Sequence, residues 1–311
     1  MKIRLLLFIV LVTLFAAGSS IQVQAQNYRF EVGGSIGASN YLGDIGGKFL
    51  PRRGFVSDMQ IKMTSLSGGL FTRYAITPRL SGNLSVNFGR IRGDDSLTTN
   101  PGRNSRNLSF RNDIFEASIT GEYDVYEAYN VGGNTRYRID YNLYAIFGFG
   151  FFMHNPTTEY LGKRIELAPL YTEGVKYALS GISTITGFGM DFSLGRNHKV
   201  GVKLTVHTTN TDYLDDVSGS YRNPNTFAND EQGQLAFALS DRRREKDPDF
   251  ETRPTGGGVR GNPKYDDSFV FFTANYAYVF KGKGGKYKRQ FHNGYIRKKG
   301  RRVGVRRFFA F

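Results

Sequence analysis

Few residues of this 311-residue chain have the types and spacing that catalysis requires. Chemistry on a lipid would need a histidine base beside a nucleophilic serine, with an acid to orient the base. The chain has four histidines: His154, His198, His207 and His292. Ser180 and Ser183 are the serines that could approach two of them, but no spacing selects a triad. We therefore predict that the protein is not an enzyme, and a lipid-modifying enzyme is the less favoured alternative.

A cluster of carboxylates is the second candidate for chemistry. Asp212, Asp215 and Asp216 lie close together in the sequence, and Asp44 could join them from another loop. Several carboxylate oxygens at an outer loop could bind Ca²⁺. The same residues commonly cap turns and accept hydrogen bonds from loop amides. No glycine-punctuated calcium loop is present, so we predict no metal and no cofactor.

The elements that would position these residues are strands, and residues 268–280 (SFVFFTANYAYVF) are the clearest. Every second side chain belongs to one apolar, aromatic-tipped face: Val270, Phe272, Ala274, Tyr276, Tyr278 and Phe280. The opposite face carries Phe271, Thr273, Asn275 and Ala277. This period-2 pattern has about the length of a membrane-spanning strand. Lipid cannot satisfy a free strand edge, so the strand must belong to a closed barrel.

Seven further alternating segments precede it, at about residues 28–36, 66–76, 80–90, 114–125, 143–151, 186–192 and 200–206. The connections are short at 77–79 and 195–199, medium at 126–140, and long at 39–65, 91–113, 154–181 and 207–267. Outer-membrane barrels have short periplasmic turns and long outer loops, and an even strand number places both termini in the periplasm. We predict an all-β, eight-stranded antiparallel outer-membrane β-barrel; a soluble β-sandwich explains the loop phasing less well.

The first 25 residues read as a secretory signal peptide. An apolar run at 5–17 follows Lys2 and Arg4, and a small-residue cleavage pattern ends at Ala25. Such a run is too short to span a membrane as a helix. We therefore expect Sec export, residues 26–280 as the barrel, and 281–311 as a separate tail. With no Cys, a lipoprotein anchor and disulfides are excluded.

Charged side chains are expected inside the barrel. The alternation turns four acids and three bases inward: Arg29, Glu31, Arg73, Glu116, Glu122, Asp191 and Lys203. An eight-stranded barrel is filled by its own side chains, and buried charges must be paired or hydrogen-bonded. We predict a packed polar core and not a conducting channel.

The basic character of the chain is concentrated in its tail. Residues 281–311 hold twelve Lys or Arg and no acid; removing these and the two basic residues of the signal peptide from the net charge of +15 leaves +1 for 26–280. Basic residues interleaved with aromatics suit an interface. The tentative contact residues are Lys286, Tyr287, Lys288, Arg289, Arg297, Lys298, Lys299, Arg301 and Arg302. We expect a flexible periplasmic tail that binds an acidic partner, peptidoglycan or anionic lipid; a solvated extension is the alternative. Export makes nucleic acid an unsuitable partner.

Three loop motifs carry a family resemblance. They are Tyr41-Leu42-Gly43-Asp44, Leu167 to Gly174 (containing Thr172-Glu173-Gly174), and Thr211 to Ser218 (containing Asp212, Tyr213, Asp215 and Asp216). In order and placement they resemble the PorG-like family of outer-membrane β-barrels, which includes a component of the type IX secretion machinery. The resemblance implies a barrel that contacts the periplasmic ring of a lipoprotein and its partner. The basic tail has no match in that family pattern.

The combined prediction is a non-enzymatic barrel in outer-membrane lipid that anchors or docks a type IX secretion-like, trans-envelope complex. A small surface barrel that binds ligands or stabilises the envelope is the first alternative.

Overall fold

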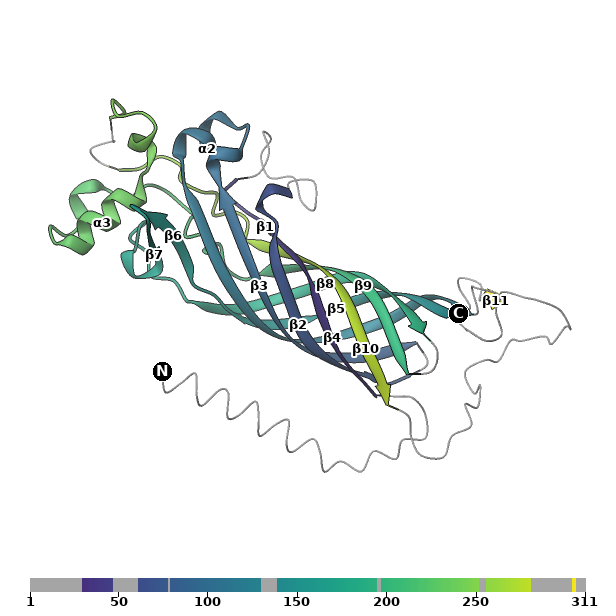
Figure 1. Cartoon of the computed structure of the whole chain (residues 1–311). Coiled ribbons are helices and arrows are strands. Elements are labelled where there is room, and N and C mark those ends of the chain that lie inside the picture. The colour runs from purple at the N-terminus through teal and green to yellow at the C-terminus, as the bar shows by residue number, and fades with distance from the viewer. Residues whose placement is uncertain are drawn as a thin grey trace, which may run out of the picture.

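Eight long antiparallel strands of the computed structural model form a closed barrel (Figure 1). The structure describes residues 30–46, 61–77, 79–129, 139–194, 197–251, 256–280 and 304–305. The barrel strands are β1 (Phe30–Leu42), β2 (Ser65–Ala75), β3 (Leu80–Asp94), β4 (Ser109–Tyr129), β5 (Ile139–Met153), β8 (Ser180–Leu194), β9 (His198–Thr209) and β10 (Ser268–Phe280). The predicted fold class and all eight predicted strands are confirmed.

Strand pairing runs β3-β2-β1-β10-β9-β8-β5-β4, and β3 pairs with β4 to close the barrel. Phe30 at the start of β1 is the partner of Phe280 at the end of β10, so both strands end at the same rim of the barrel. A two-residue strand, β11 (Gly304–Val305), pairs with Tyr129 and Ala128 of β4. All interstrand neighbours in the barrel are antiparallel, as a closed even-numbered barrel requires.

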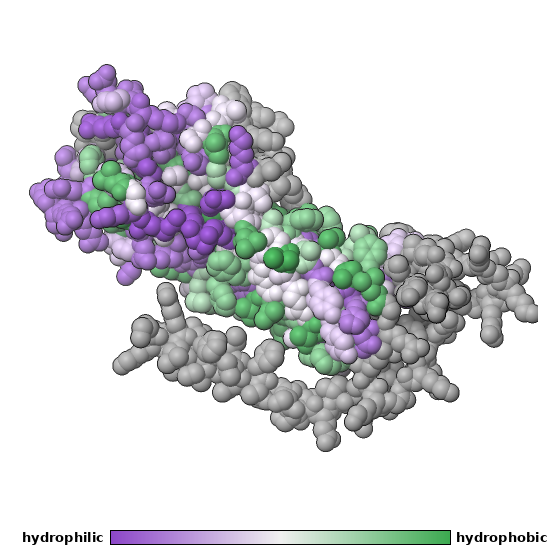
Figure 2. All heavy atoms as spheres, viewed as in Figure 1, coloured by the Kyte–Doolittle hydropathy of each residue, from purple (hydrophilic) through white to green (hydrophobic). Residues whose placement is uncertain are grey.

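The outer surface of the barrel is an apolar belt. On β10, the exposed side chains are those of Phe272, Ala274, Tyr276, Tyr278 and Phe280, and the residues between them are buried. The eight residue-to-residue steps from 272 to 280 correspond to a belt about 20 Å tall for strands tilted by about 40°. On the face visible in Figure 2, hydrophobic side chains gather on the barrel and hydrophilic ones over the loops. The predicted outward face is thus observed, and this belt is what lipid would contact.

Val270 departs from that prediction. Its side chain is only 3% exposed and packs with Leu42 and Val206 in a small apolar cluster at the outer end of β1, β9 and β10. The predicted lipid-facing side of this strand includes one residue too many at its loop end, because an alternating pattern alone cannot show where a strand leaves the lipid.

Several strands are longer than predicted and continue beyond the belt. β3 and β4 pair as far as Asp94 and Ser109, inside the predicted loop at 91–113. The remaining loops contain two strands, β6 (Pro156–Tyr160) and β7 (Lys163–Glu166), and short helices. The helices are η3 (Ile61–Met63), η4 (Asp95–Leu97), α2 (Pro101–Arg106), η5 (Ala168–Leu170), η6 (Pro224–Thr226), α3 (Glu231–Ser240) and η7 (Arg243–Glu245). No helix in the described part of the chain is long and apolar enough to cross a membrane.

The long loops fold together into a compact unit, called here the outer domain: residues 43–46, 61–64, 95–108, 154–179 and 210–267 of the described chain. It has its own hydrophobic core with the ends of the strands. Fully buried members include Ile91 of β3, Leu214 of the last loop and Phe269 of β10, and Leu239 of α3 is 2% exposed. This core extends from the barrel mouth into the loops, so the outer loops are part of the folded structure.

Candidate site in the barrel interior and outer domain

Paired charges fill the half of the barrel interior nearer the rim at which β1 starts. Arg73 lies at the centre: Nη1 is 3.0 Å from Glu31 and 2.6 Å from Asp191, and Nε is 2.5 Å from Glu122. All four side chains are at most 8% exposed. Nη1 lies between Glu31 and Asp191, and Nε lies against Glu122, so one guanidinium forms ion pairs with three carboxylates. The barrel is therefore sealed here by ion pairs.

Two lysines complete the neutralisation of these acids. Lys203 Nζ is 2.9 Å from Glu122, and Lys199 contacts Glu31. The ammonium of Lys203 also lies 4.7 Å from the ring centroid of Phe71, a cation–π geometry. The predicted inward residues Glu31, Arg73, Glu122, Asp191 and Lys203 thus come together, whereas Arg29 lies outside the described residues. Lys199 was missed because it falls in the segment predicted as a turn.

Glu116 forms a separate buried group nearer the outer domain. Ser183 Oγ donates to Glu116 Oε1 at 2.5 Å, and His207 Nδ1 lies 3.0 Å from the same oxygen. Phe269 stacks on the His207 ring at 4.6 Å. The serine hydroxyl is directed to the carboxylate and not to the imidazole, so serine and histidine are not arranged as nucleophile and base. Both are almost fully buried, which favours a structural role.

His154, the other rim histidine, is also held in a structural position. Asn112 Nδ2 lies 3.1 Å from its Nδ1, and its Nε2 lies 3.2 Å from Ala178 O. The Asn112 amide can donate to Nδ1, and Nε2 can donate to the carbonyl of Ala178. These two hydrogen bonds fit a neutral imidazole with its proton on Nε2. Burial lowers the pKa of His154 to about 4, which keeps it neutral near pH 7. Ser180 is exposed on the opposite side of these contacts.

A polar cavity of about 50 Å³ lies between the charged layer and the Glu116 group. It is lined by Asn83, Ser118, Thr120, Thr273 and Asn275, among others. Such a space can hold a few water molecules that hydrogen-bond the buried side chains. It is an internal hydration site within a filled barrel, as expected for eight strands.

In the outer domain, the first and third sequence motifs meet at the hydroxyl of Tyr41. Tyr41 Oη lies 2.7 Å from Asp215 Oδ2 and 2.6 Å from Asp267 Oδ1, and it accepts the Asp44 N–H at 3.0 Å. A phenol has one proton and two lone pairs, so it can donate to only one carboxylate. The other carboxyl must carry its own proton and donate to Tyr41.

The remaining contacts identify which carboxyl is protonated. Asp215 accepts two backbone N–H groups, from Ile45 at 3.1 Å and Val217 at 2.9 Å, which stabilise its charge. Asp267 accepts one, from Leu214 at 3.0 Å. Burial, followed by the nearby carboxylates, raises the pKa of both aspartates well above the usual range. The geometry assigns the proton to Asp267 Oδ1.

Gly43 makes this cluster possible. A Cβ at this position would lie 1.9 Å from Tyr41 Oη and 2.0 Å from Asp267 Oδ1. Any larger residue would therefore displace the hydroxyl or the carboxyl. The Tyr-Leu-Gly-Asp motif has a physical explanation in this packing: its tyrosine supplies the hydroxyl, its glycine leaves the space, and Asp44 supplies the N–H.

The second motif is connected through Arg260. Its Nη1 is 2.9 Å from Glu173, and its Nη2 is 3.6 Å from Asp216. Glu173 also accepts the Ser218 and Gly219 N–H groups at 3.0 Å each. Asp216 accepts from Thr172 Oγ1 at 2.5 Å and Tyr177 OH at 2.6 Å. Burial raises the pKa of Asp216 in spite of the neighbouring guanidinium.

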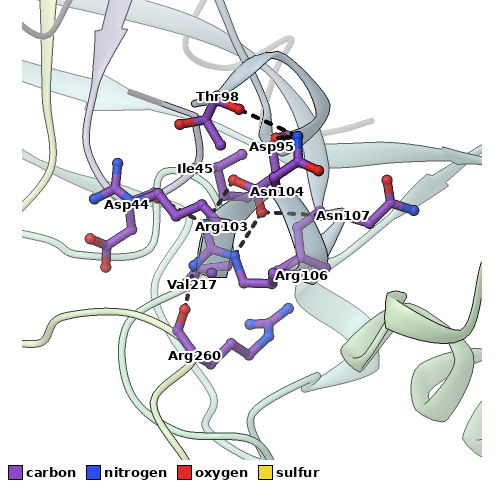
Figure 3. A network of polar contacts seen from close by, with 12 residues as sticks. Asp44, Ile45, Asp95, Thr98, Arg103, Asn104, Arg106, Asn107, Val217 and Arg260 are labelled. Atoms are coloured by element: carbon purple, nitrogen blue, oxygen red, sulfur yellow. Dashed lines mark hydrogen bonds and ion pairs between the residues drawn. The ribbon is translucent and has the colours of Figure 1, made fainter. Parts of the chain in front are cut away.

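Arg106 at the end of α2 connects the second loop to the others (Figure 3). Its Nε donates to Asp95 at 2.7 Å, its Nη2 donates to Asp44 O at 2.8 Å, and its Nη1 donates to the carbonyl of Arg260. Asp95 is fully buried and accepts the Gly46 N–H at 3.0 Å. We call the residues around Tyr41, Arg106 and Arg260 the clasp: Tyr41, Asp44, Asp95, Arg106, Glu173, Asp215, Asp216, Arg260 and Asp267. It joins all four outer loops.

Most motif residues therefore meet in or beside the clasp. Tyr213 stacks on Tyr177 with ring centroids 4.6 Å apart, Asp212 is 8% exposed, Gly174 has a φ of +78°, and Leu42 packs in the apolar cluster. The predicted contact residues of the tail, 286–302, lie outside the described residues. Reasoning from sequence missed Asp95, Arg106, Arg260 and Asp267, since isolated charges in irregular loops give no periodic signal.

The carboxylates do not converge on a cation site. Asp215 and Asp216 direct their oxygens to different protein donors, as described above. Among the described residues, no group of three or more His, Asp or Glu side chains is placed to hold a metal ion. The calcium hypothesis for Asp212, Asp215 and Asp216 thus has no geometric support here.

Comparisons with known proteins complete this description. A family model described as "Domain of unknown function (DUF6089)" matches residues 5–238. No curated protein matches the chain. Among solved structures, Ail of Yersinia pestis in complex with the heparin analogue sucrose octasulfate aligns with 12% identity over 81% of this chain and 99% of its own, with a TM-score of 0.33. The N-terminal β-barrel domain of Pseudomonas aeruginosa OprF aligns with 9% identity over 79% and 96%, with a TM-score of 0.29. The PorG-like resemblance of the motifs is not tested by these matches.

Proposed function

This chain belongs to the DUF6089 family, and we propose that it is a non-enzymatic anchor of the outer membrane. The proposal rests on the way in which the barrel interior and the outer loops are each held in place. The barrel interior is filled by paired charges around Arg73, and the outer loops are fixed to one another by the clasp. Such a molecule offers a rigid membrane body and defined surfaces on both sides. The described histidines and serines form no nucleophile–base pair.

The finer proposal is that the anchor docks a type IX secretion-like complex from the periplasmic side. Its support is the three motifs that resemble the PorG-like family, together with the tail at 281–311, which holds twelve basic residues and no acid. β10, which leads into the tail, ends at the same rim as the start of β1. An acidic surface on a periplasmic ring of a lipoprotein and its partner would complement this tail; peptidoglycan and anionic lipid are the alternative partners.

Crosslinking in intact cells tests the docking role. A photo-reactive residue at Tyr287, in the tail, would be activated in the full chain, and the adducts identified by mass spectrometry. The matched control places the same group at Leu161, at the 85%-exposed tip of the outer hairpin β6–β7. Adducts with a periplasmic secretion-ring protein from position 287 and not from 161 are expected. Adducts with peptidoglycan or lipid alone would contradict docking to the ring.

Deletion of residues 282–311 gives an independent test. The barrel strands end at Phe280, so the shortened chain should fold and insert. We expect weaker recovery of the complex in a pull-down through the barrel. Unchanged recovery would exclude the tail as the docking element.

A second candidate function is ligand binding at the cell surface. It is favoured by the outer domain, which has its own core and exposes Leu161 and Val259 by 85% and 83%. Exposed apolar side chains mark a binding surface where they form one contiguous patch. Replacing both residues with serine should abolish surface binding without affecting recovery of the envelope complex, which distinguishes the two functions.

A further inference from the structure

One wall of the barrel carries an arginine patch directly above the apolar belt. Phe88 of β3 and Phe115 of β4 are register partners at the upper edge of the belt, each 42% exposed. Two residues farther on the same outward face, Arg90 is the partner of Asp113. The next outward pair is Arg92 and Arg111. A rise of about 3.3 Å per residue, along strands tilted by about 40°, places the Cα atoms of these residues within about 10 Å of the aromatic edge along the membrane normal, at headgroup height.

Positive charge is not balanced within this patch. Arg90 contacts Asp113 with two donors, at 2.6 and 3.1 Å, and Arg111 contacts the same carboxylate at 3.3 and 3.1 Å. One acid thus serves two guanidinium groups. Arg92 instead donates to Ser65 Oγ at 2.8 Å and to Thr64 O at 3.2 Å, both neutral. The ion pairs among the described residues do not include Arg92.

The pairing of Arg92 with Arg111 is unfavourable without an anion. Like charges directly opposite each other on neighbouring strands destabilise a sheet. The next acid on this face, Asp94, lies farther from the belt, and its side chain accepts the Ser96 N–H at 2.8 Å. The side chains remain accessible to solvent: Arg90 is 35% and Arg111 28% exposed, and Arg92 is exposed as well. A net charge of about +2 therefore faces the lipid boundary.

The wall formed by β8 and β9 lacks this feature among the described residues. At the outer ends of β8 and β9, the exposed side chains are Ser180, Ile182 and Thr208, which are neutral. A general requirement for solvation at the membrane boundary would place charges around the whole rim. Their presence on the β3–β4 wall and absence from the β8–β9 wall point to a local ligand.

We propose that Arg90, Arg92 and Arg111 bind the phosphate of an anionic lipid of the outer leaflet. Guanidinium groups bind phosphate oxygens with two parallel hydrogen bonds, and Arg92 and Arg111 are register partners on neighbouring strands, so one phosphate could be reached from both. The acyl chains of the lipid would lie on the belt below, against Phe88 and Phe115. The inference rests on the proposed location in the outer membrane but not on the docking role.

Native mass spectrometry of the full chain in detergent micelles tests this proposal. The chain would be titrated with bis-phosphorylated lipid A, with dephosphorylated lipid A and with inorganic phosphate. The test variant is Arg92→Gln/Arg111→Gln, which leaves the Arg90–Asp113 pair intact. The matched control, Lys163→Gln/Arg164→Gln, removes the same charge from the exposed hairpin tip. Heat-modifiable gel migration would confirm that each protein is folded as a barrel.

We expect the phosphorylated lipid to bind the wild type and the control equally, and the dissociation constant to rise at least tenfold in the test variant. Dephosphorylated lipid should bind weakly to all three proteins. Equal binding by test variant and wild type, or equal loss in the control, would overturn the site. Competition by inorganic phosphate at lipid-like concentrations would show a free-phosphate site and overturn the lipid assignment. A wild type that does not insert as a barrel would contradict the proposed membrane anchor itself.

Discussion

The barrel interior and the outer domain both bury several carboxylates, but they stabilise them in different ways. In the barrel, Glu31, Glu122 and Asp191 surround Arg73, and two lysines add further positive charge. In the clasp, Asp215 and Asp267 share the hydroxyl of Tyr41 and have no such cation in contact. The first region relies on ion pairs around one arginine, whereas the second combines the ion pairs of Arg106 and Arg260 with hydrogen bonds to Tyr41 and a retained proton. The backbone differs too: closed strand pairing holds the barrel, whereas side chains hold the loops.

The largest predicted effect comes from Arg73→Met. Three buried carboxylates would lose their shared cation, and breaking a buried ion pair from one side costs about 3–5 kcal/mol. We expect the free energy of unfolding of the barrel in detergent micelles to fall by that amount, measured by urea titration and gel migration. Arg164→Gln, at the exposed hairpin, is the control and should change nothing. An unaltered unfolding midpoint for Arg73→Met would show that ion pairing does not stabilise the interior.

Arg260→Met should destabilise the outer domain without destabilising the barrel. Glu173 and Asp216 would remain buried without their cation, so the outer domain should lose about 3 kcal/mol of stability. Hydrogen exchange should then increase at residues 211–219 and 258–267, with no change in the barrel strands. Lys176→Gln, which removes an exposed positive charge from the outer domain, is the control. Faster exchange in β1 and β10 as well would mean that barrel and outer domain unfold as one unit.

The barrel could be predicted from the sequence because the environment of its side chains alternates between lipid and barrel interior at every residue. Each spanning strand must alternate apolar and polar side chains, so Phe272 and Thr273 are assigned to opposite faces from their neighbours alone. The inward charges follow from the same alternation. The strand ends could not be predicted in this way. Beyond the belt both faces of β3 and β4 leave the lipid, Ile91 and Phe110 are buried in the outer core, and the pattern that marks a strand is lost.

The clasp could be predicted only in part. Its motif residues Tyr41, Asp215 and Asp216 were singled out, but their partners were not. Asp267 is 226 residues from Tyr41 and directly precedes a strand, and Arg260 lies in a glycine-rich segment. Contacts between distant irregular segments depend on the path of each loop, which no local spacing determines. The calcium hypothesis arose because spacing shows how near carboxylates are in sequence but not where their oxygens point.

Tyr41→Phe should have an intermediate effect. The hydroxyl is the group that joins Asp215 to Asp267, and leaving buried polar groups without a partner costs about 1–3 kcal/mol each. We expect the outer domain to be opened more readily by limited proteolysis in intact cells, with the barrel unaffected. Tyr171→Phe is the control, since Tyr171 is 38% exposed at the surface. Equal protease resistance of both variants would argue that the hydroxyl contributes nothing to the clasp.

The smallest change in stability is expected for Asp267→Asn, and it tests the assigned proton. An asparagine can place Nδ2 where the protonated oxygen donates to Tyr41, and its Oδ1 can still accept the Leu214 N–H. Near pH 5 the variant should therefore be about as stable as the wild type. Asp215→Asn should be less stable than either, because both Asp215 oxygens accept backbone N–H groups and an amide nitrogen would oppose one of them.

The pH dependence gives the sharper result. The pKa of Asp267 is raised in the folded protein, mainly by burial and then by Asp215, whereas an unfolded aspartate titrates near about pH 3.9. The folded outer domain thus binds more protons than the unfolded one above that pH. The contribution of Asp267 to the stability of the outer domain is fully present below about pH 4 and is lost as the pH rises through the folded pKa. In Asp267→Asn this loss should be reduced, as measured by guanidinium-induced opening of the outer domain between pH 4 and 8. An identical pH slope in wild type and variant would place the proton on a group other than Asp267.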